Sequence, residues 1–325
     1  METQNNQNEK LIVTKNLKKD YAAMVGGFGQ KATVHALDRI DLEIFKGETL
    51  GLVGESGCGK STLGRMIIRL ENPTEGEVYY RDKDLLSLSR KELNPLRRNL
   101  QIIFQDPYSS LNARHTIGQI IGEGLKIHNI GTNAEQTKKV KDLMKVVGLR
   151  EDAYECYPHE FSGGQRQRIG IARALALNPE LIVCDEPVSA LDVSIQAQVI
   201  NLLLELQKEF QLTYLFISHD LSVVKYISDR IAVMYLGRLV ELAPKNELYA
   251  KPSHPYTRAL LSAVPIPNPE KKRDRHSISG DVPSPISPPK GCHFHPRCQE
   301  AKPICREEVP EFREFAPDHW VRCFS

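Results

Sequence analysis

The 325-residue sequence lacks long apolar runs and any excess of one charge. No stretch approaches the roughly 18 uninterrupted apolar residues that a membrane-spanning helix requires, so the chain is not expected to form a membrane pore alone. Its 43 basic and 41 acidic residues leave a net charge of +2, which gives no reason to expect nucleic acid as a partner. The polar start, METQNNQNEK, contains no apolar signal core, so we expect a cytoplasmic location.

A glycine-rich segment, GESGCGKST at residues 54–62, follows the apolar run at residues 49–53 and fits the pattern G-x-x-x-x-G-K-[ST]. Its glycines are Gly54, Gly57 and Gly59. They let the main chain curl so that successive N–H groups, and the N-terminus of the helix expected next, point at anionic oxygens. Lys60 would reach the β- and γ-phosphates, and the Ser61 hydroxyl would bind Mg²⁺. The segment therefore predicts a nucleoside triphosphate site; the alternative is a glycine-rich turn that fits by chance.

A second candidate anion site is SGGQ at residues 162–165, ahead of an apolar-periodic helix. Ser162 is a good N-cap, and the amides of Gly163 and Gly164 would be exposed at the helix N-terminus. Taken alone, this is ordinary helix capping. The two candidate anion sites each begin a different helix. One nucleotide could contact both sites if the SGGQ site came from another subunit.

Two carboxylates follow the apolar run at residues 181–184. Asp185 would hold Mg²⁺ through water, and Glu186 would polarise the attacking water. The alternative is a solvated strand end. His219 closes the apolar run at residues 213–217, a position that favours a hydrogen bond to phosphate or water, although a lone histidine is usually structural.

Hydrophobic patterning predicts an α/β fold. Near-continuous apolar runs at residues 50–53, 181–184 and 213–217 are typical of buried parallel strands, and helical patterns separate them. Residues 11–83 contain short alternating runs, which indicate further strands around the phosphate-binding helix.

Three other regions have distinct patterns. Residues 112–160 show no convincing strand, and residues 132–148 predict an amphipathic helix in a helical insert. Residues 231–242 predict a hairpin whose turn, Gly237-Arg238, places glycine first. Residues 265–290, rich in proline, serine and charge, indicate a linker or an extended segment.

Four of the seven cysteines lie beyond residue 290: Cys292, Cys298, Cys305 and Cys323. In a reducing compartment, this crowding argues for a metal before disulfides, and four thiolates suit an iron–sulfur cluster or a zinc site. The gaps exceed those of paired C-x2–4-C knuckles, which favours iron–sulfur; His293 and His295 keep a mixed zinc site open, and unrelated thiols remain an alternative. Cys58, placed at a helix N-terminus, is expected to have a somewhat reactive thiolate.

The combination of GESGCGKST, SGGQ, IVCDEP and the histidine after residue 218 resembles the nucleotide-binding subunits of ABC transporters over residues 10–250. This resemblance implies a fold with an antiparallel β portion and a helical insert at about residues 107–178. The ATP-binding residues it implies are Tyr21, Gly54, Glu55, Ser56, Gly57, Cys58, Gly59, Lys60, Ser61, Thr62, Ser162, Gly163, Gly164, Gln165 and Asp192. The implied Mg²⁺ ligands are Ser61, Gln105 and Asp185, and the implied catalytic residues are Glu186, His219 and Gln105.

Individual roles also come from this resemblance. Tyr21 would stack on adenine, although residues 22–34 look like an insertion that makes its alignment uncertain. Gln105 would sense the γ-phosphate and the membrane partner. Asp192 would lie at the seam between two ATPase subunits, and residues 162–165 would contact ATP held by the opposite subunit.

The segments PSHPYTRAL, at residues 252–260, and GCHFHPRC, at residues 291–298, resemble the C-terminal extension of oligopeptide and dipeptide importer ATPases, some of which carry a [4Fe-4S] cluster. The resemblance implies a small, irregular, cysteine-rich extension at residues 251–325. It also implies a peripheral subunit on the cytoplasmic face of the membrane, which couples ATP hydrolysis to peptide import. The expected partners are a homologous second ATPase, two transmembrane permease subunits and an extracytoplasmic substrate-binding protein.

Other functions remain open at this point. An importer of the same subfamily for nickel, opines or oligosaccharides would have the same ATPase chemistry. An ABC protein acting on DNA or ribosomes tends to carry long coiled-coil insertions or two tandem cassettes, and neither occurs in this sequence. A metal-sensing regulator would depend on the cysteine-rich tail alone.

Overall fold

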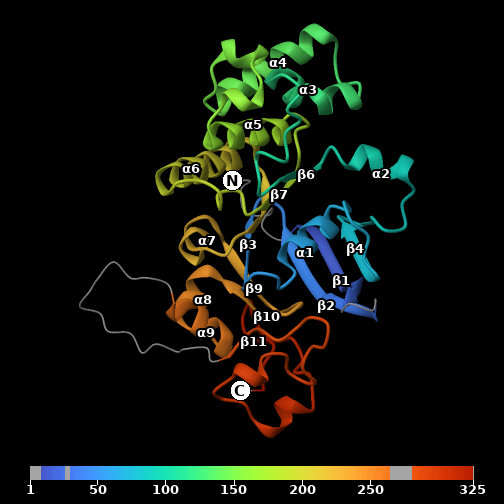
Figure 1. Cartoon of the computed structure of the whole chain (residues 1–325), viewed down its shortest axis with the longest axis vertical. Helices are drawn as coiled ribbons and strands as arrows, with labels where there is room; N and C mark the ends of the chain where they lie inside the picture. The colour runs from blue at the N-terminus through green and yellow to red at the C-terminus, as the bar shows by residue number, and fades with distance from the viewer. Residues whose placement is uncertain (1–8, 26–29, 264–279, 325) are drawn as a thin grey trace, which may run out of the picture. The chain divides into compact units, whose positions relative to one another are not determined.

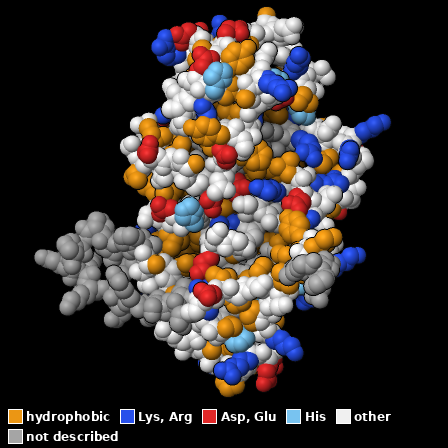
Figure 2. All heavy atoms as spheres, viewed as in Figure 1, with side chains coloured by type: hydrophobic (Ala, Val, Ile, Leu, Met, Phe, Trp, Pro, Cys, Tyr) orange, Lys and Arg blue, Asp and Glu red, His pale blue; other side chains and the backbone are white. Residues whose placement is uncertain are grey.

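The computed structural model describes residues 9–25, 30–263 and 280–324, which divide into two compact units (Figure 1). Unit 1 contains Glu9, Phe45–Glu48 and Ser87–Ile217. Unit 2 contains the described residues of Lys10–Ile44, Thr49–Leu86 and Ser218–Ser325. On the face drawn in Figure 2, acidic and basic side chains are interspersed, as the near-zero net charge predicts.

A parallel sheet forms the centre of unit 1. Strands β6 (Leu100–Ile103), β7 (Leu181–Asp185) and β8 (Thr213–Ile217) are neighbours in that order, with Leu181 paired to both Leu100 and Thr213. Every residue of β7 and β8 is buried, which explains their continuous apolar runs and confirms both predicted strands. Strand β6 was not predicted because the polar Gln101 interrupts its apolar run. The Gln101 amide donates to the Arg97 carbonyl at 2.6 Å.

Helices make up most of the rest of unit 1, and α3, α4 and α5 pack together (Figure 1). No strand occurs in residues 112–160, all of which the structure describes, as predicted. Capping boxes begin α2, α3, α4 and α5, each contributing on the order of 1 kcal/mol. The helices are α2 (Arg90–Leu96), α3 (Ile117–Ile127), α4 (Asn133–Val146), the 3-10 turns η1 (Glu151–Glu155) and η2 (Pro158–Glu160), α5 (Gly163–Leu175) and α6 (Val193–Phe210).

Unit 2 contains a four-stranded sheet in the order β2-β1-β4-β5. Its strands are β1 (Lys10–Val25), β2 (Gln30–Phe45), β4 (Glu75–Tyr80) and β5 (Lys83–Asp84). The predicted insertion at residues 22–34 falls at the end of β1 and the start of β2, with residues 26–29 outside the described residues.

A second set of strands in unit 2 joins the N-terminal part of the chain to its C-terminal end. The strand order is β11-β12-β10-β9-β3, in which β3 and β9 are parallel and the other pairs are antiparallel. The extension, expected to be irregular, thus contributes β11 and β12 to this sheet. The strands are β3 (Thr49–Val53), β9 (Arg230–Tyr235), β10 (Arg238–Pro244), β11 (Arg313–Ala316) and β12 (His319–Val321).

The hairpin predicted at residues 231–242 is formed by β9 and β10, but its turn differs from the prediction. Leu236 and Gly237 are the turn residues, with φ of 43° and 77°. Both backbones are left-handed, as in a type I′ turn, so glycine is the second turn residue and the predicted Gly-first turn is wrong. The turn type was not predicted because its first residue, Leu236, is a buried leucine, a residue that rarely adopts a left-handed backbone.

Short helices complete unit 2, and a buried carboxylate ties three of its elements together. Glu241 of β10 has no solvent exposure; it accepts hydrogen bonds from the amides of Ser253 (2.7 Å) and His254 (3.0 Å) and from Nε2 of His319 (2.7 Å).

The helices of unit 2 are α1 (Lys60–Ile67), α7 (Leu221–Ile227), α8 (Lys245–Ala250), α9 (Pro255–Ser262), η3 (His295–Arg297) and η4 (Pro303–Arg306).

Two sequence expectations concern the membrane and the linker. Among residues 9–25, 30–263 and 280–324, no helix combines the length and apolarity needed to cross a membrane. Most of the predicted linker at residues 265–290 lies outside the described residues; its last part, residues 280–290, is irregular.

Burial of His254 predicts a pH-dependent stability for α9. Nδ1 of His254 accepts the Tyr256 amide at 3.1 Å as the N-cap of this helix, and burial lowers the His254 pKa to about 4. Between pH 6.5 and 4, the unfolded state binds the proton that the folded state excludes, so stability falls as pH falls through this window, by up to roughly 3 kcal/mol. His254→Asn keeps a capping oxygen and should flatten this dependence, measured by hydrogen exchange of α9 amides. An equal pH slope in both proteins would contradict the assignment.

Candidate functional site

The glycine-rich segment forms a loop between β3 and α1, as predicted. Gly54, Gly57 and Gly59 have φ of 155°, 77° and 103°. A Cβ at Gly54 would lie 2.2 Å from the Met234 carbonyl oxygen, so this backbone approach requires glycine. Gly59 is the N-cap of α1 and makes no side-chain hydrogen bond, so no capping side chain occupies the helix N-terminus, where anions bind in other proteins.

Lys60 places its ammonium inside this loop. Its Nζ donates to the carbonyl oxygens of Gly54 (2.8 Å) and Glu55 (3.1 Å), and the side chain is buried. The cation is therefore held by the loop backbone at the position where an anion entering the loop would meet it.

Cys58 differs from its prediction. The residue is only 5% exposed, and burial raises the pKa of its thiol, although the nearby Lys60 ammonium acts in the opposite direction. The expected reactive thiolate is wrong because the desolvation of Cys58 outweighs the effect of the helix N-terminus and of Lys60.

Tyr21 lies beside the helix that the phosphate-binding loop begins. Its hydroxyl forms hydrogen bonds with the side chains of Glu71 and Thr62, and burial raises its pKa. The Lys19 ammonium lies 4.8 Å from the centroid of the Tyr21 ring. The structure thus brings Tyr21 to α1, and adenine stacking remains a prediction.

In unit 1, the carboxyl end of β7 carries the predicted carboxylates. Asp185 is 2% exposed, and Glu186 follows it with a left-handed φ of 47°. This conformation costs on the order of 1 kcal/mol in a residue other than glycine. The Glu186 amide donates to the Ile217 carbonyl (3.0 Å), and Nε2 of Gln105 donates to Oε2 of Glu186 (3.0 Å). Two predicted catalytic residues, Gln105 and Glu186, are therefore in direct contact.

The SGGQ segment begins α5 with a reciprocal capping box. The Gln165 amide donates to the Ser162 hydroxyl (3.4 Å), and the Ser162 amide donates to Oε1 of Gln165 (3.0 Å). A Cβ at Gly164 would lie 2.4 Å from Cγ2 of Ile195, so glycine allows α5 and α6 to approach closely. Asp192, at the N-cap of α6, is exposed and makes no side-chain capping bond. The segment and Asp192 thus lie on neighbouring helix starts.

His219 lies in unit 2, between β8 and α7, and is exposed. The next residue, Asp220, caps α7 by accepting the amides of Ser222 (2.8 Å) and Val223 (3.3 Å). The cap fixes the start of α7 next to His219. The predicted site residues divide between the units. Unit 2 contains Tyr21, residues 54–62, His219 and the four C-terminal cysteines, and unit 1 contains Gln105, residues 162–165, Asp185, Glu186 and Asp192.

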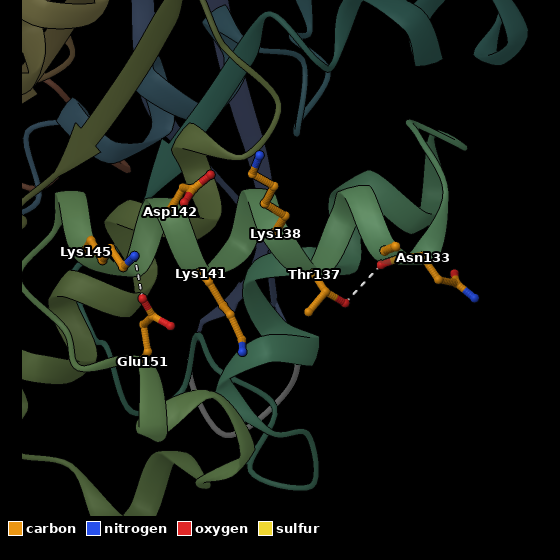
Figure 3. Close-up of a pocket in the computed structure, with 8 residues that line it drawn as sticks. Asn133, Thr137, Lys138, Lys141, Asp142, Lys145 and Glu151 are labelled. Atoms are coloured by element: carbon orange, nitrogen blue, oxygen red, sulfur yellow. Dashed lines mark hydrogen bonds and ion pairs between the residues drawn. The ribbon is translucent and has the colours of Figure 1, made fainter.

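A surface depression of about 580 Å³ lies on α4, apart from every predicted site residue (Figure 3). Two of its polar groups already have partners: the Thr137 hydroxyl donates to the Asn133 carbonyl at 2.9 Å, and Lys145 pairs with Glu151. Neither motif residues nor a buried unpaired polar group line this depression, so we assign no ligand to it.

The C-terminal thiols influence one another. Burial raises the pKa of Cys292 to about 11, and repulsion from the thiolates of the other three cysteines adds to this shift. The Cys292 amide donates to the Cys305 carbonyl at 2.9 Å. Within the described part of the chain, no group of three or more Cys, His, Asp or Glu side chains has the spacing to hold a metal ion.

Two residues that contact the phosphate-binding loop were not predicted. The hydroxyl of Tyr256 accepts the Glu55 amide at 3.0 Å, and the Arg297 guanidinium pairs with the Glu55 carboxylate at 2.7 Å. Both residues belong to segments quoted for the importer resemblance, but neither fits a phosphate-binding pattern, so the sequence carried no signal for these contacts.

Comparison with known proteins places the chain in a family. An ABC transporter family model matches residues 37–189, and an "Oligopeptide/dipeptide transporter, C-terminal region" model matches residues 240–305. The oligopeptide transport ATP-binding protein AppF of Bacillus subtilis is 57% identical over 97% of both chains. The chain belongs to the ATP-binding subunits of ABC transporters. It is an ABC-type ATPase, as its motifs predicted.

Other members of this ABC family agree with this assignment. The dipeptide transport ATP-binding protein DppF of Haemophilus influenzae is 48% identical, over 98% of this chain and 97% of its own length. A solved dimeric structure of the ATP-binding cassette MJ0796, in a post-hydrolysis state with ADP and Pi bound, is 32% identical with a TM-score of 0.64. It covers 72% of this chain and 98% of the cassette.

Proposed function

We propose that this chain is the ATP-hydrolysing motor subunit of an importer for dipeptides or oligopeptides. The observation that carries the proposal is the presence, in one chain, of a cassette match and an oligopeptide/dipeptide C-terminal match. Relatives that align over nearly the whole chain are named for oligopeptide or dipeptide transport, which favours peptides over nickel, opines or oligosaccharides.

The loop in unit 2 would bind the nucleotide. The N-terminus of α1, which no side chain caps, and the buried Lys60 ammonium would supply the positive potential that the β- and γ-phosphates require. Tyr21, already packed beside Thr62, would stack on adenine, and the exposed His219 would contact the γ-phosphate.

The carboxylates of unit 1 would serve hydrolysis. Glu186 would accept the proton of the attacking water, and its left-handed backbone holds it in the orientation that β7 imposes. Gln105 donates to this carboxylate, so a movement of Gln105 towards a γ-phosphate would also reposition the base. This contact gives a physical route by which a membrane partner touching Gln105 could influence hydrolysis.

The residues present fit Mg²⁺, which prefers oxygen ligands. The Ser61 hydroxyl, the Gln105 amide oxygen and the buried Asp185 carboxylate are the oxygen donors that would hold it. When bound, Mg²⁺ would neutralise charge on the phosphates.

A second ATPase subunit would complete the mechanism. The capped start of α5 and the exposed Asp192 would meet ATP held by a homologous partner, as the dimeric cassettes support by analogy. The γ-phosphate would draw the two subunits together, and its loss after hydrolysis would release them. Because Ser162 and Gln165 satisfy each other's capping groups, this helix start is already formed in the single chain.

The membrane partners follow from the importer assignment. Two permease subunits would receive the closing and opening motion, and a substrate-binding protein outside the membrane would deliver the peptide. The chain would act as a peripheral subunit on the cytoplasmic face.

The four C-terminal thiols would hold a [4Fe-4S] cluster, with zinc as the alternative. A single zinc ion bonds its thiolates at about 2.3 Å and draws them together tightly. In a cluster each thiolate binds a different iron, which spreads the sulfur atoms. What supports the cluster is the crowding of four cysteines into residues 292–323, with gaps wider than those of paired zinc knuckles.

Peptide import can be tested on the assembled transporter. The chain, its partner ATPase and the two permeases, reconstituted in lipid vesicles, should hydrolyse ATP several-fold faster when a peptide-loaded binding protein is added, because loading favours the closed dimer. Phosphate release measures the effect. Stimulation by a nickel- or sugar-loaded binding protein, and not by peptide, would refute the peptide assignment.

Substitution of the proposed base should separate binding from hydrolysis. Glu186→Gln should lower ATP turnover about 100-fold or more while ATP still binds, because only proton acceptance is removed. Phosphate release and a nucleotide titration measure the two steps. Glu209→Gln, an exposed change at the end of α6, is the matched control and should leave turnover unchanged. Turnover near normal in Glu186→Gln would exclude Glu186 as the base.

Metal content can decide the cluster proposal. Protein purified without oxygen should contain close to four iron atoms per chain and show the broad visible absorption of iron–sulfur proteins. Cys298→Ser should lower both, whereas Cys156→Ser in unit 1 should not. Stoichiometric zinc without visible absorption would support the alternative and contradict the cluster.

A further inference from the structure

The C-terminal extension contacts the phosphate-binding loop through a partly buried ion pair. Arg297, at the end of η3, lies 242 residues from Glu55 in the sequence. Its Nη1 lies 2.7 Å from Oε2 of Glu55, and its Nη2 lies 3.1 Å from Oε1. The side chains are 8% and 25% exposed. This bidentate geometry fixes both the distance and the orientation of the carboxylate.

The backbone of Glu55 is held as well. Its amide donates to the Tyr256 hydroxyl at 3.0 Å, and Arg297 also donates to the Tyr235 hydroxyl at 3.4 Å. Both ends of Glu55, the amide and the carboxylate, are therefore bound by residues outside the glycine-rich motif.

An aromatic cluster supports these contacts. The ring centroids of Tyr235 and Tyr256 are 4.7 Å apart, and Phe294 lies 5.2 Å from Tyr235 and 5.3 Å from Tyr256. Phe294 and Arg297 both lie between Cys292 and Cys298. The cysteine-rich segment is thus packed against the two tyrosines that border the loop.

Glu55 in turn contacts the lysine of the loop. Its carbonyl oxygen accepts a hydrogen bond from Nζ of Lys60 at 3.1 Å. A displacement of Glu55 would move this acceptor and change the position of the ammonium that meets the phosphates. A continuous series of contacts therefore joins Arg297 to Lys60.

We propose that Arg297 and Tyr256 are positioning residues for the nucleotide, and that the C-terminal extension sets the ATP affinity of the loop by holding Glu55. This inference rests on the proposed binding of ATP by residues 54–62. Because coupling between two sites is reciprocal, ATP in the loop also stabilises the docking of residues 292–298.

Replacement of Arg297 tests the proposal in the full-length chain. Arg297→Gln should weaken ATP binding about five- to tenfold, a typical size for coupling between sites, and raise KM by the same factor while kcat changes less than twofold. Glu55→Gln should have a similar effect, and the double variant should bind ATP no more weakly than either single one, because both break the same ion pair. Binding is measured with a fluorescent ATP analogue and turnover by phosphate release.

Arg258→Gln is the matched control. Arg258 belongs to the same extension, but its ion pair, at 2.7 Å, is with Glu300 and not with Glu55. It should leave ATP affinity unchanged. Equal weakening in Arg258→Gln and Arg297→Gln, or additive effects of Glu55→Gln and Arg297→Gln, would overturn the proposal.

Hydrogen exchange gives a readout that does not depend on activity. ATP should slow the exchange of amides at residues 292–298 in the parent chain and have little effect in Arg297→Gln. If Arg297→Gln does not fold, Tyr256→Phe removes only one hydroxyl and should weaken ATP binding by a smaller factor; unchanged binding there would refute the proposal.

A further variant separates this inference from the function on which it rests. Lys60→Ala should abolish ATP binding if residues 54–62 are the nucleotide site. If Lys60→Ala has no effect, the proposed function fails; if it abolishes binding but Arg297→Gln and Tyr256→Phe do not weaken binding, only the positioning role fails.

Discussion

The path of the main chain through residues 54–59 is the constraint on which the site in unit 2 depends. The loop passes so close to the β9–β10 hairpin that a Cβ at Gly54 would lie 2.2 Å from the Met234 carbonyl oxygen, and a Cβ at Gly59 would lie 2.4 Å from that of Ala36. The carbonyl oxygens of Gly54 and Glu55 accept hydrogen bonds from Lys60, and no side chain caps the start of α1. The proposed anion site thus depends on the backbone geometry of the loop more than on any single side chain.

Carboxylates in the two units have different bonding partners. In unit 2, the fully buried Glu241 is held by two amides and His319, and the partly buried Glu55 is held by Arg297. Such pairing is required because an unpartnered buried charge costs several kcal/mol. In unit 1, Glu186 interacts with the exposed amide of Gln105, a neutral and movable partner. Glu241 and Glu55 are therefore bound by donors that fix their orientation, whereas Glu186 is bound by a neutral amide side chain.

Local patterns predicted the features that depend on neighbouring residues. The strands at residues 181–184 and 213–217, the loop between β3 and α1, and the Ser162 cap were all predictable because burial, glycine content and capping chemistry act within a few positions. Features that depend on distant packing were missed or wrong. Burial raised the pKa of the Cys58 thiol despite its place at a helix N-terminus. The left-handed backbone of Leu236 was not predicted because leucine rarely adopts this conformation. The roles of the predicted site residues remain predictions, since contacts such as Gln105 with Glu186 show proximity and not chemistry.

The predicted boundary at residue 250 lies inside the C-terminal family match at residues 240–305, and hydrogen bonds connect residues on its two sides. Strand β10 precedes this boundary, yet the donors to its buried Glu241 are Ser253, His254 and His319, which all follow it. Removal of the residues after 250 would leave this carboxylate buried without a partner or expose the sheet around it to water, and either outcome is costly. The same removal would take away Tyr256 and Arg297, the two residues that hold Glu55. The extension therefore belongs to the same folding unit as the phosphate-binding loop, and a change in its thiol cluster has a direct physical path to that loop.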